Sequence, residues 1–383
     1  MKRREYPKNK KSRNYVIKDL IRRSIISAVF FVVVVLIVGA EWKHSVNDFE
    51  SSKKESIRVE EQQSDTQKGK NSNQPLQNKK SSAVITLKDT EPIEIKLGEP
   101  FIDPGYTAED KDGTDLTSQV KADTSGLSRA GDQQVVYTVM GNNQVEAETV
   151  RQVKVLPNTE YASSGLPICM YHYVYDPAAP PENIDNNFIS TTALAEEMKY
   201  LHENGYYFPS WQEVRDYIDG KLLLPEKSIV LTFDDGPNYM YLGIPILERY
   251  QIPATSFVIA GYWNSREMLY GYASNYLTFE SHSYKMHQGG GSIGHGGIYT
   301  AMSREEVLAD LQKSFEICGN QEAFAYPFGD YKEEGCAVLE EAGLLCAVTT
   351  ENSKAYPGDN PYLLPRVRML GTQTLDQFIS EIQ

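Results

Sequence analysis

Apolar runs of strand length alternate with helical patterns between residues 165 and 383, and this alternation restricts the possible folds more than any other feature. Ile229-Val230-Leu231 is continuously apolar, as in a strand whose sheet is covered on both faces. Ser303–Cys318 begins with a Ser-x-x-Glu capping box and carries an apolar stripe at helical spacing. The alternation predicts an α/β domain, either a parallel (β/α) barrel or a wound sheet, with functional groups at the carboxyl ends of its strands.

The predicted elements of this domain are short and closely spaced. The predicted strands are Pro167–Val174, Tyr206–Pro209, Ser228–Phe233, Ala254–Ala260, Ala323–Tyr326 and Leu344–Thr349. The predicted helices are Thr191–Asn204, Trp211–Asp219, Leu242–Tyr250, Ser303–Cys318 and Glu333–Ala342.

Residues 83–157 have a different pattern, in which short alternating strands are separated by turn residues. Residues 135–139 and 149–155 alternate as strands with one buried face do, and Asp112-Gly113 supplies a turn between strands. This pattern predicts a small all-β antiparallel sandwich. The segment resembles the immunoglobulin-like modules common on bacterial surface proteins, and the resemblance implies a spacer or a module that contacts the cell wall.

Three segments precede the predicted sandwich. Residues 1–23 hold ten Lys or Arg, and residues 24–42 form an apolar stretch close to the roughly 20 residues that a helix needs to cross a bilayer. The basic flank precedes this stretch, which predicts a single-pass transmembrane helix, a cytoplasmic tail and the rest of the chain outside the cell. A cleaved signal peptide is the alternative. Residues 43–82 are polar, with hardly an aromatic residue, and predict a flexible linker.

Composition restricts the partners and the redox chemistry. The net charge of −14, without a basic stripe after residue 23, argues against nucleic acid as a partner. The four cysteines are scattered and contain no CxxC pair, which argues against a structural zinc site. We expect buried free thiols, with a single disulfide as the alternative. The sequence predicts no particular oligomeric state.

The strongest local signal is a pair of adjacent carboxylates at the end of a predicted strand. Asp234 and Asp235 directly follow Ser228–Phe233 and precede a Gly-Pro turn. Two neighbouring ionised carboxylates repel each other unless a cation or a proton compensates their charge. The pair indicates a site for a cation or for proton transfer, although a turn with two incidental acidic residues has the same pattern.

A second signal is a pair of histidines, His282 and His287, five residues apart. On a regular helix this spacing puts the two side chains well off a common face, so they need a loop to converge. Alone, they are equally consistent with a surface loop. Together with one Asp they form a three-ligand set with an open position for water, as catalytic zinc prefers.

Four motifs, TFDDGP, SHSYKMH, AYPFG and the first-strand ICMYHYV, resemble those of the NodB-type polysaccharide deacetylases of carbohydrate esterase family 4. The resemblance runs from about Leu166 to Arg368. It implies a distorted parallel (β/α) barrel and a metal-dependent hydrolase. The implied reaction removes N-acetyl groups from N-acetylglucosamine-containing polysaccharide, either peptidoglycan or poly-N-acetylglucosamine. The histidine spacing is similar to that of the branch acting on poly-N-acetylglucosamine and related polymers.

The resemblance also implies roles for single residues. Asp235, His282 and His287 would bind a divalent metal, and Asp234 would be the general base. The backbone N–H of Phe328 would stabilise the oxyanion. One carboxylate and two imidazoles suit Zn²⁺ best, with Co²⁺, Ni²⁺ or Fe²⁺ as alternatives.

Two positions depart from the family pattern. Ala325 stands where many members carry an Arg that orients the base, and no His follows His295, so the late His that serves as general acid is missing. By elimination, we expect His172, at the end of the first predicted strand, to protonate the leaving amine. Either Arg366 or Arg368 would replace the missing cation beside the base.

Other interpretations stay open. His295 lies in the glycine-rich segment Gly289–Gly297, which lacks the GK[ST] of a phosphate-binding loop and is expected to be a flexible lid or a surface loop. One rival function is an esterase that removes O-acetyl groups from xylan or another glycan. The other is a non-catalytic wall-binding homologue, which Ala325 and the missing late His would fit.

Overall fold

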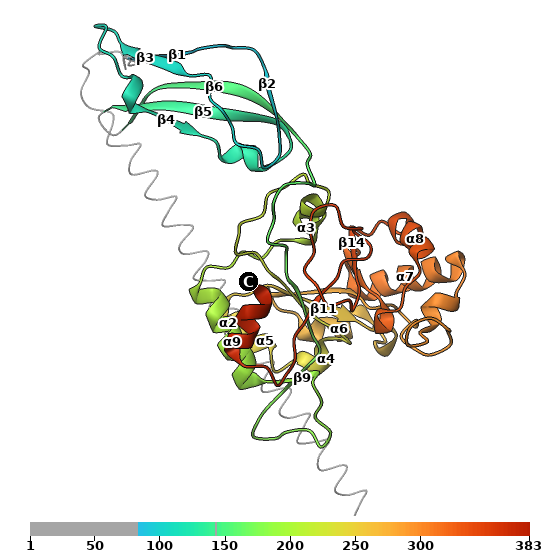
Figure 1. The fold of residues 1–383 in the computed structure, drawn as a ribbon. Helices are drawn as coiled ribbons and strands as arrows, with labels where there is room; N and C mark the ends of the chain where they lie inside the picture. Colours follow the sequence, from blue (N-terminus) through green and yellow to red (C-terminus); the bar gives the residue numbers. More distant parts are fainter. Residues whose placement is uncertain (1–82, 142–143) are drawn as a thin grey trace, which may run out of the picture. The chain divides into compact units, whose positions relative to one another are not determined.

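The computed structural model describes residues 83–141 and 144–383 (Figure 1). The predicted cytoplasmic tail, transmembrane helix and linker, residues 1–82, lie outside the described residues. Among the helices that are described, none combines the length and the apolar character needed to cross a bilayer.

The smaller domain is an all-β sandwich. Its strands are β1 (Ala83–Leu87), β2 (Ile93–Lys96), β3 (Tyr106–Asp110), β4 (Val120–Asp123), β5 (Gly131–Gly141) and β6 (Gln144–Leu156). One sheet has the order β2-β6-β5-β4, and β1 pairs with β3 in the other. Val135, Tyr137 and Val139 of β5 are buried and alternate with partly exposed residues, as predicted for a strand with one core face. The sandwich is not wholly antiparallel, because β2 runs parallel to β6.

The larger domain is built on a curled sheet of seven strands, in which all neighbours are parallel. The strands are β7 (Ile168–Tyr171), β10 (Val230–Phe233), β11 (Ala254–Val258), β12 (Leu277–Ser281), β13 (Ala323–Ala325), β14 (Cys346–Val348) and β15 (Val367–Arg368). Their spatial order is β14-β13-β12-β11-β10-β7-β15. The predicted distorted parallel barrel is therefore found as a curled parallel sheet, and its carboxyl strand ends all meet at one rim.

One short segment links the two edges of this sheet. Leu364 accepts a hydrogen bond from the Thr349 amide and donates one to the Ala347 carbonyl, beside β14. Three residues later, Val367 and Arg368 pair with β7 at the opposite edge. The segment 364–368 thus holds the curl of the sheet nearly closed.

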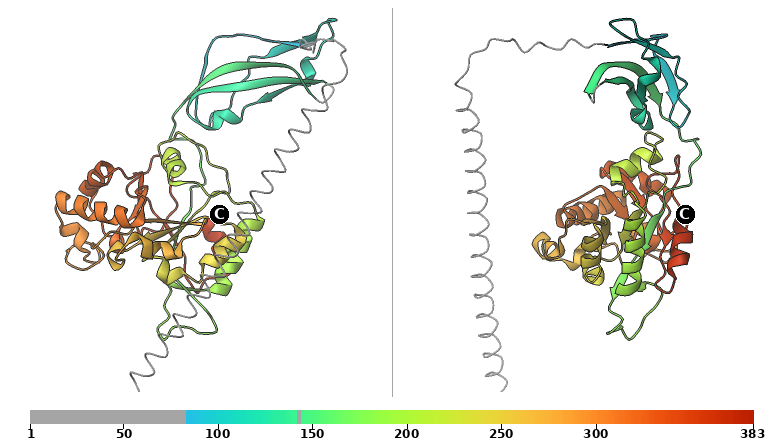
Figure 2. Two further views of the ribbon diagram at one scale, coloured as in Figure 1. Left: turned by 180° about the vertical axis from the view of Figure 1, so that it is seen from behind. Right: turned by 90° about the vertical axis from the view of Figure 1, so that its left-hand side faces the viewer.

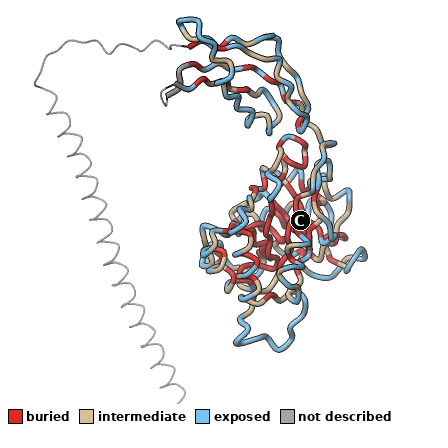
Figure 3. The backbone as a smooth tube through the Cα atoms, turned by 60° about the vertical axis from the view of Figure 1, so that its left-hand side comes forward, coloured by how far each residue is buried: buried red, intermediate tan, exposed pale blue. Residues whose placement is uncertain are grey.

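Helices cover the outside of the sheet. They are α2 (Thr191–Glu203), α3 (Trp211–Ile218), α4 (Pro237–Met240), α5 (Ile244–Tyr250), α6 (Arg266–Leu269), α7 (Arg304–Cys318), α8 (Cys336–Glu341) and α9 (Leu375–Ile382). Helices α2, α5 and α9 pack together, as do α7 and α8 in another part of the domain (Figures 1 and 2). The buried residues of this domain concentrate in its interior (Figure 3).

The element predictions differ from the structure at several places, and α4, α6, α9 and β15 were not predicted. Tyr206–Pro209 is not a strand, because only Tyr207 makes a β-bridge, to Ser228. The predicted strand Pro167–Val174 is split into β7 and the short β8 (Tyr173–Tyr175), which pairs with β9 (Phe188–Ser190). Strand β12 was missed because it contains Glu280, whose buried carboxylate accepts hydrogen bonds from the backbone amides of Glu322 and Ala323.

The expectation of free thiols is confirmed. All four cysteines are unpaired, and Cys169, Cys318 and Cys346 are buried. Burial raises the pKa of Cys318 to about 12, so this thiol stays protonated and packs as a small apolar side chain.

Replacing Glu197 should change how stability depends on pH. Glu197 of α2 is 2 % exposed and accepts a hydrogen bond of 2.7 Å from the Tyr171 hydroxyl at the end of β7. Burial raises the pKa of Glu197 to about 7. Because the unfolded carboxyl has the lower pKa, the free energy of unfolding falls as pH rises from about 4.5 to 7. Glu197→Gln removes this titration. The free energy of unfolding of the variant minus that of wild type should therefore increase by roughly 2 kcal/mol from pH 5 to pH 8.

Denaturant unfolding at several pH values measures this difference. Glu203→Gln, at the exposed end of the same helix, is the matched control and should follow wild type. A pH-independent difference between Glu197→Gln and wild type would contradict the prediction.

Candidate active site

A pocket of about 370 Å³ opens at the carboxyl ends of the parallel strands. It brings together all six residues that the sequence singled out for the site. They are His172, Asp234, Asp235, His282, His287 and Phe328.

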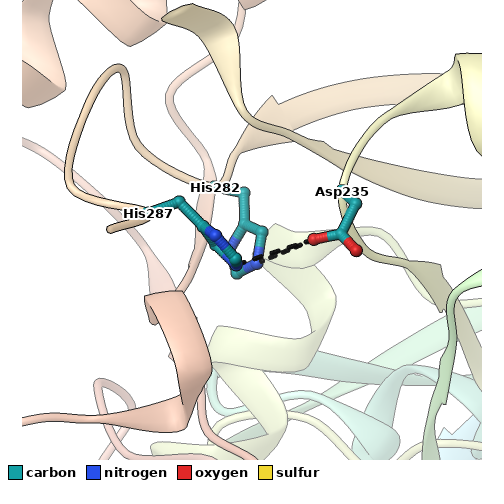
Figure 4. Close-up of side chains that lie close together, drawn as sticks. All are labelled: Asp235, His282 and His287. Atoms are coloured by element: carbon teal, nitrogen blue, oxygen red, sulfur yellow. Dashed lines mark ion pairs between the residues drawn. The ribbon is translucent and has the colours of Figure 1, made fainter. Parts of the chain in front are cut away.

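Three of these residues turn their ligand atoms toward one another (Figure 4). Asp235 Oδ1 lies 3.8 Å from His282 Nε2 and 3.6 Å from His287 Nε2, and the three atoms are within 4.8 Å of one another. Ligand atoms around a tetrahedral zinc, at bonds of about 2.1 Å, are about 3.4 Å apart. The separations of Asp235, His282 and His287 therefore fit a single ion.

The hydrogen bond of His282 and the lowered pKa of His287 also suit a metal. His282 Nδ1 is 2.7 Å from the Ala325 carbonyl and donates to it, which leaves Nε2 as the free lone pair. Burial, together with the neighbouring His282, lowers the pKa of His287 to about 4, so its ring is neutral at pH 7. Neutral imidazole is the form that binds metal ions.

The second oxygen of Asp235 is held by a residue that sequence reasoning missed. The Tyr173 hydroxyl donates to Asp235 Oδ2 at 2.7 Å, while Oδ1 faces the histidines. Burial, and then the bond to this carboxylate, raises the pKa of Tyr173, so the phenol stays a donor. Tyr173 stands next to His172 in the first-strand motif, and that position was its only sequence signal.

Asp234 is bound on both oxygens by a buried guanidinium. Arg366 donates to Asp234 Oδ1 at 2.7 Å and to Oδ2 at 2.8 Å, and its side chain is 0 % exposed. Burial alone would raise the pKa of Asp234, but the charge and hydrogen bonds of Arg366 outweigh it and hold the pKa well below its ordinary value. The cation expected beside the base is therefore Arg366. Arg368 instead donates to Asn187.

His172 lies on the same side of the pocket as Asp234. Its Nε2 is 4.0 Å from Asp234 Oδ2, and its ring is partly exposed to the pocket. Burial lowers the pKa of His172, and the charges of Asp234 and Asp235 oppose this effect. His172 can therefore exchange a proton with a ligand in the pocket, which is the geometry its predicted role requires.

Backbone strain is concentrated at the site. Five non-glycine residues of the described chain have positive φ, and three belong here: Asp235 (72°), Ser283 (76°) and Phe328 (60°). Each such residue costs on the order of 1–3 kcal/mol and persists only because its surroundings enforce it. The bend at Asp235 ends β10 and lets adjacent carboxylates reach different partners. Phe328 lines the pocket, and no hydrogen bond from its backbone N–H to another described residue is found.

A second residue that sequence reasoning missed holds the loop between the two histidines. The Asp310 carboxylate, on α7, accepts hydrogen bonds from the backbone amides of Tyr284 at 2.7 Å and Lys285 at 2.8 Å. One turn later, Ser314 bonds to Ser281 at the end of β12. These buried polar residues interrupt the face of α7 that carries Leu311, and that interruption was an available sequence signal.

Breaking the Asp234 ion pair should destabilise the protein strongly. Arg366→Met leaves the Asp234 carboxylate buried without a partner, and we expect a loss of about 3–5 kcal/mol in the free energy of unfolding. Adding Asp234→Asn, which removes the charge and keeps the shape, should restore much of this loss. Denaturant unfolding of the four proteins gives the coupling energy.

The control for this cycle is Arg368→Met, a neighbouring and exposed arginine of the same segment, which should stay within about 1 kcal/mol of wild type. Equal stability of Arg366→Met and Arg368→Met would refute the buried-pair interpretation.

Removing Asp310 should weaken metal binding without removing a ligand. Asp310→Ala frees the loop that carries His282 and His287, and we expect the affinity for Zn²⁺ to fall about 10- to 100-fold. Competition with a chromogenic chelator measures this affinity on the purified full-length chain. Glu305→Ala, an exposed acidic residue on the first turn of the same helix, is the control. Unchanged affinity in Asp310→Ala would show that the loop keeps its shape unaided.

Comparisons with known proteins agree with this arrangement. Residues 222–347 match the family model for polysaccharide deacetylases, and residues 85–155 match the one for the Ig-like domain of bacterial surface proteins. The chain is 27% identical over 203 residues to a Staphylococcus aureus poly-beta-1,6-N-acetyl-D-glucosamine N-deacetylase, covering 49% of this chain and 69% of that protein. It is 29% identical over 215 residues to Bacillus subtilis YxkH, a candidate polysaccharide deacetylase, covering 53% and 71%.

A solved structure shares the fold of the larger domain. The Streptococcus pyogenes deacetylase PplD, in complex with acetate, aligns with a TM-score of 0.50 and 21% identity. The alignment covers 58% of this chain and all of that one. The chain therefore contains a NodB-type polysaccharide deacetylase domain, which makes it a hydrolase, preceded by a bacterial Ig-like domain.

Proposed function

We propose that this protein is a metal-dependent deacetylase that removes N-acetyl groups from N-acetylglucosamine-containing polysaccharide and releases acetate. The observation that carries the proposal is one pocket that holds three metal-ligand candidates beside the Arg366-bound Asp234. The S. aureus relative is named for N-deacetylation of poly-β-1,6-N-acetylglucosamine, which supports this polymer, ahead of peptidoglycan, as the substrate class.

Asp235, His282 and His287 would hold the metal, and the set of one carboxylate and two imidazoles favours Zn²⁺, with Co²⁺, Ni²⁺ or Fe²⁺ also suited to it. When bound, such an ion supplies Lewis acidity, which acidifies water and polarises an acetyl carbonyl. Tyr173 keeps Asp235 turned toward the histidines, and the Ala325 carbonyl keeps His282 in the tautomer that offers Nε2.

The remaining residues move protons and stabilise charge. Asp234 accepts a proton from the water that attacks the acetyl carbon, and Arg366 keeps this carboxylate ionised and oriented. The backbone N–H of Phe328 donates to the developing oxyanion. As the carbon–nitrogen bond breaks, His172 gives a proton to the leaving amine, so that acetate and a free amino sugar result.

The proposed location follows from the sequence alone. Residues 24–42 would anchor the protein in the cell membrane by a single helix, with the deacetylase domain outside the cell, where such glycans lie. The Ig-like domain, residues 85–155, would act as a spacer or contact the wall polymer.

The proposal predicts chelator-sensitive acetate release from N-acetylglucosamine oligomers or peptidoglycan by the purified full-length chain. Zn²⁺ should restore the activity after chelation. Asp234→Asn should lower kcat about 10²- to 10⁴-fold, because it removes the general base. Asp376→Asn, an exposed residue on the first turn of α9, is the matched control and should keep full activity.

Other results would point elsewhere. Release only from O-acetylated glycans would make the protein an esterase with the same site. Metal binding without release from any acetylated glycan would favour a non-catalytic wall-binding protein. Full activity in Asp234→Asn would contradict the assignment of the base.

A further inference from the structure

The glycine-rich segment Gly289–Gly297 is a mostly exposed loop, which agrees with the expected surface loop, and its end folds around a buried carboxylate. Asp330 is 4 % exposed and accepts hydrogen bonds of 2.8 Å from the backbone amides of His295 and Gly297. Gly294 has φ +60°, and a Cβ there would lie 1.9 Å from Asp330 Oδ1. Glycine is thus required at this position because the carboxylate occupies the space of a side chain.

The same carboxylate orients the imidazole of His295. His295 Nδ1 lies 3.2 Å from Asp330 Oδ1 and donates to it, so Nε2, across the ring, carries the free lone pair. No described residue bonds to this Nε2. The side chain is 74 % exposed, yet it lines the catalytic pocket. An exposed imidazole is therefore fixed in one orientation at the pocket wall.

His295 lies at the pocket wall near Phe328, but none of the proton-transfer or metal-binding roles proposed above falls to it. Its segment packs against Phe328, because a Cβ at Gly297 would lie 3.0 Å from the Phe328 ring. His172, in contrast, is the imidazole beside Asp234. His295 is also outside the group of side chains whose atoms converge as metal ligands.

We propose that His295 is a substrate-binding residue, whose Nε2 accepts a hydrogen bond from a hydroxyl group of the N-acetylhexosamine chain in the pocket. The inference rests on the proposed function, since it takes the glycan as the ligand. A sugar hydroxyl donates readily to a neutral imidazole. Asp330 fixes the ring before the glycan arrives, so little side-chain entropy is lost on binding.

Two substrates separate this role from a catalytic or structural one. An N-acetylglucosamine oligomer carries the hydroxyls that His295 would bind, whereas 4-nitrophenyl acetate carries an acetyl group and no sugar. For the zinc-loaded full-length chain, His295→Ala should raise KM for the oligomer about 3- to 10-fold, as one lost neutral hydrogen bond does. Its kcat on the oligomer, its rate on 4-nitrophenyl acetate and its zinc content should stay within about twofold of wild type.

Two further variants sharpen the test. His202→Ala, an exposed histidine of α2 outside the pocket, is the matched control and should leave KM unchanged. Asp330→Asn weakens the hold on His295, so it should raise KM in the same direction and add little when combined with His295→Ala. The equilibrium Kd of the oligomer for the metal-free protein should shift like KM.

Equal losses of activity on the oligomer and on 4-nitrophenyl acetate would indicate that His295 takes part in the reaction itself. An unchanged KM and Kd for the oligomer would mean that His295 does not contact the glycan. Either result overturns the inference while the deacetylase proposal stands. Failure of the proposed function is seen in wild type alone, as no acetate release from the oligomer by the zinc-loaded protein, and the inference would fall with it.

Discussion

The buried ion pair between Arg366 and Asp234 is the interaction on which the rest of the site depends. Taking an isolated carboxylate and a guanidinium out of water costs several kcal/mol for each ion, and their attraction offsets this only with good geometry and further hydrogen bonds. Both conditions are met. The pair is bidentate, and Arg366 also donates to the Thr349 carbonyl and the Thr232 hydroxyl.

The fold supplies this geometry through the segment that links the sheet edges. Leu364 is hydrogen-bonded beside β14 and Val367 is paired with β7, so the backbone on both sides of Arg366 is held by the two edges of the sheet. Its side chain then reaches Asp234 at the end of β10, a strand next to β7. The same segment therefore closes the curled sheet and orients the Asp234 carboxylate through Arg366. The shape of the pocket thus depends on contacts that also stabilise the domain.

The sequence predicted which residues meet in the pocket better than it predicted which residues hold them in place. Asp234, Asp235, His282 and His287 were identified because an adjacent carboxylate pair and two histidines together match a three-ligand set, and because their motifs resemble those of the polysaccharide deacetylases. Tyr173, Asp310 and Asp330 were missed as supporting residues, because each acts through one or two hydrogen bonds to groups distant in sequence.

Two strands were also missed because they depend on contacts between residues distant in sequence. Strand β12 holds a buried glutamate that breaks the apolar pattern, and β15 is only two residues long, Val367–Arg368. Neither strand has an apolar periodicity that can be recognised in its own stretch of sequence. Their assignment depends on parallel neighbours that only the folded chain brings beside them.

The departure at Ala325 is explained by the position of Arg366. A parallel sheet that curls until its ends meet brings residues far apart in the sequence to one rim, so a cation beside Asp234 can come from either side of the curl. Here it comes from the closing segment, and β13 carries the small Ala325, whose carbonyl holds the His282 ring at 2.7 Å. A backbone acceptor needs no particular side chain. The position that seemed to lack a catalytic residue can therefore still orient a metal-ligand candidate, and the charge it does not carry is supplied by Arg366.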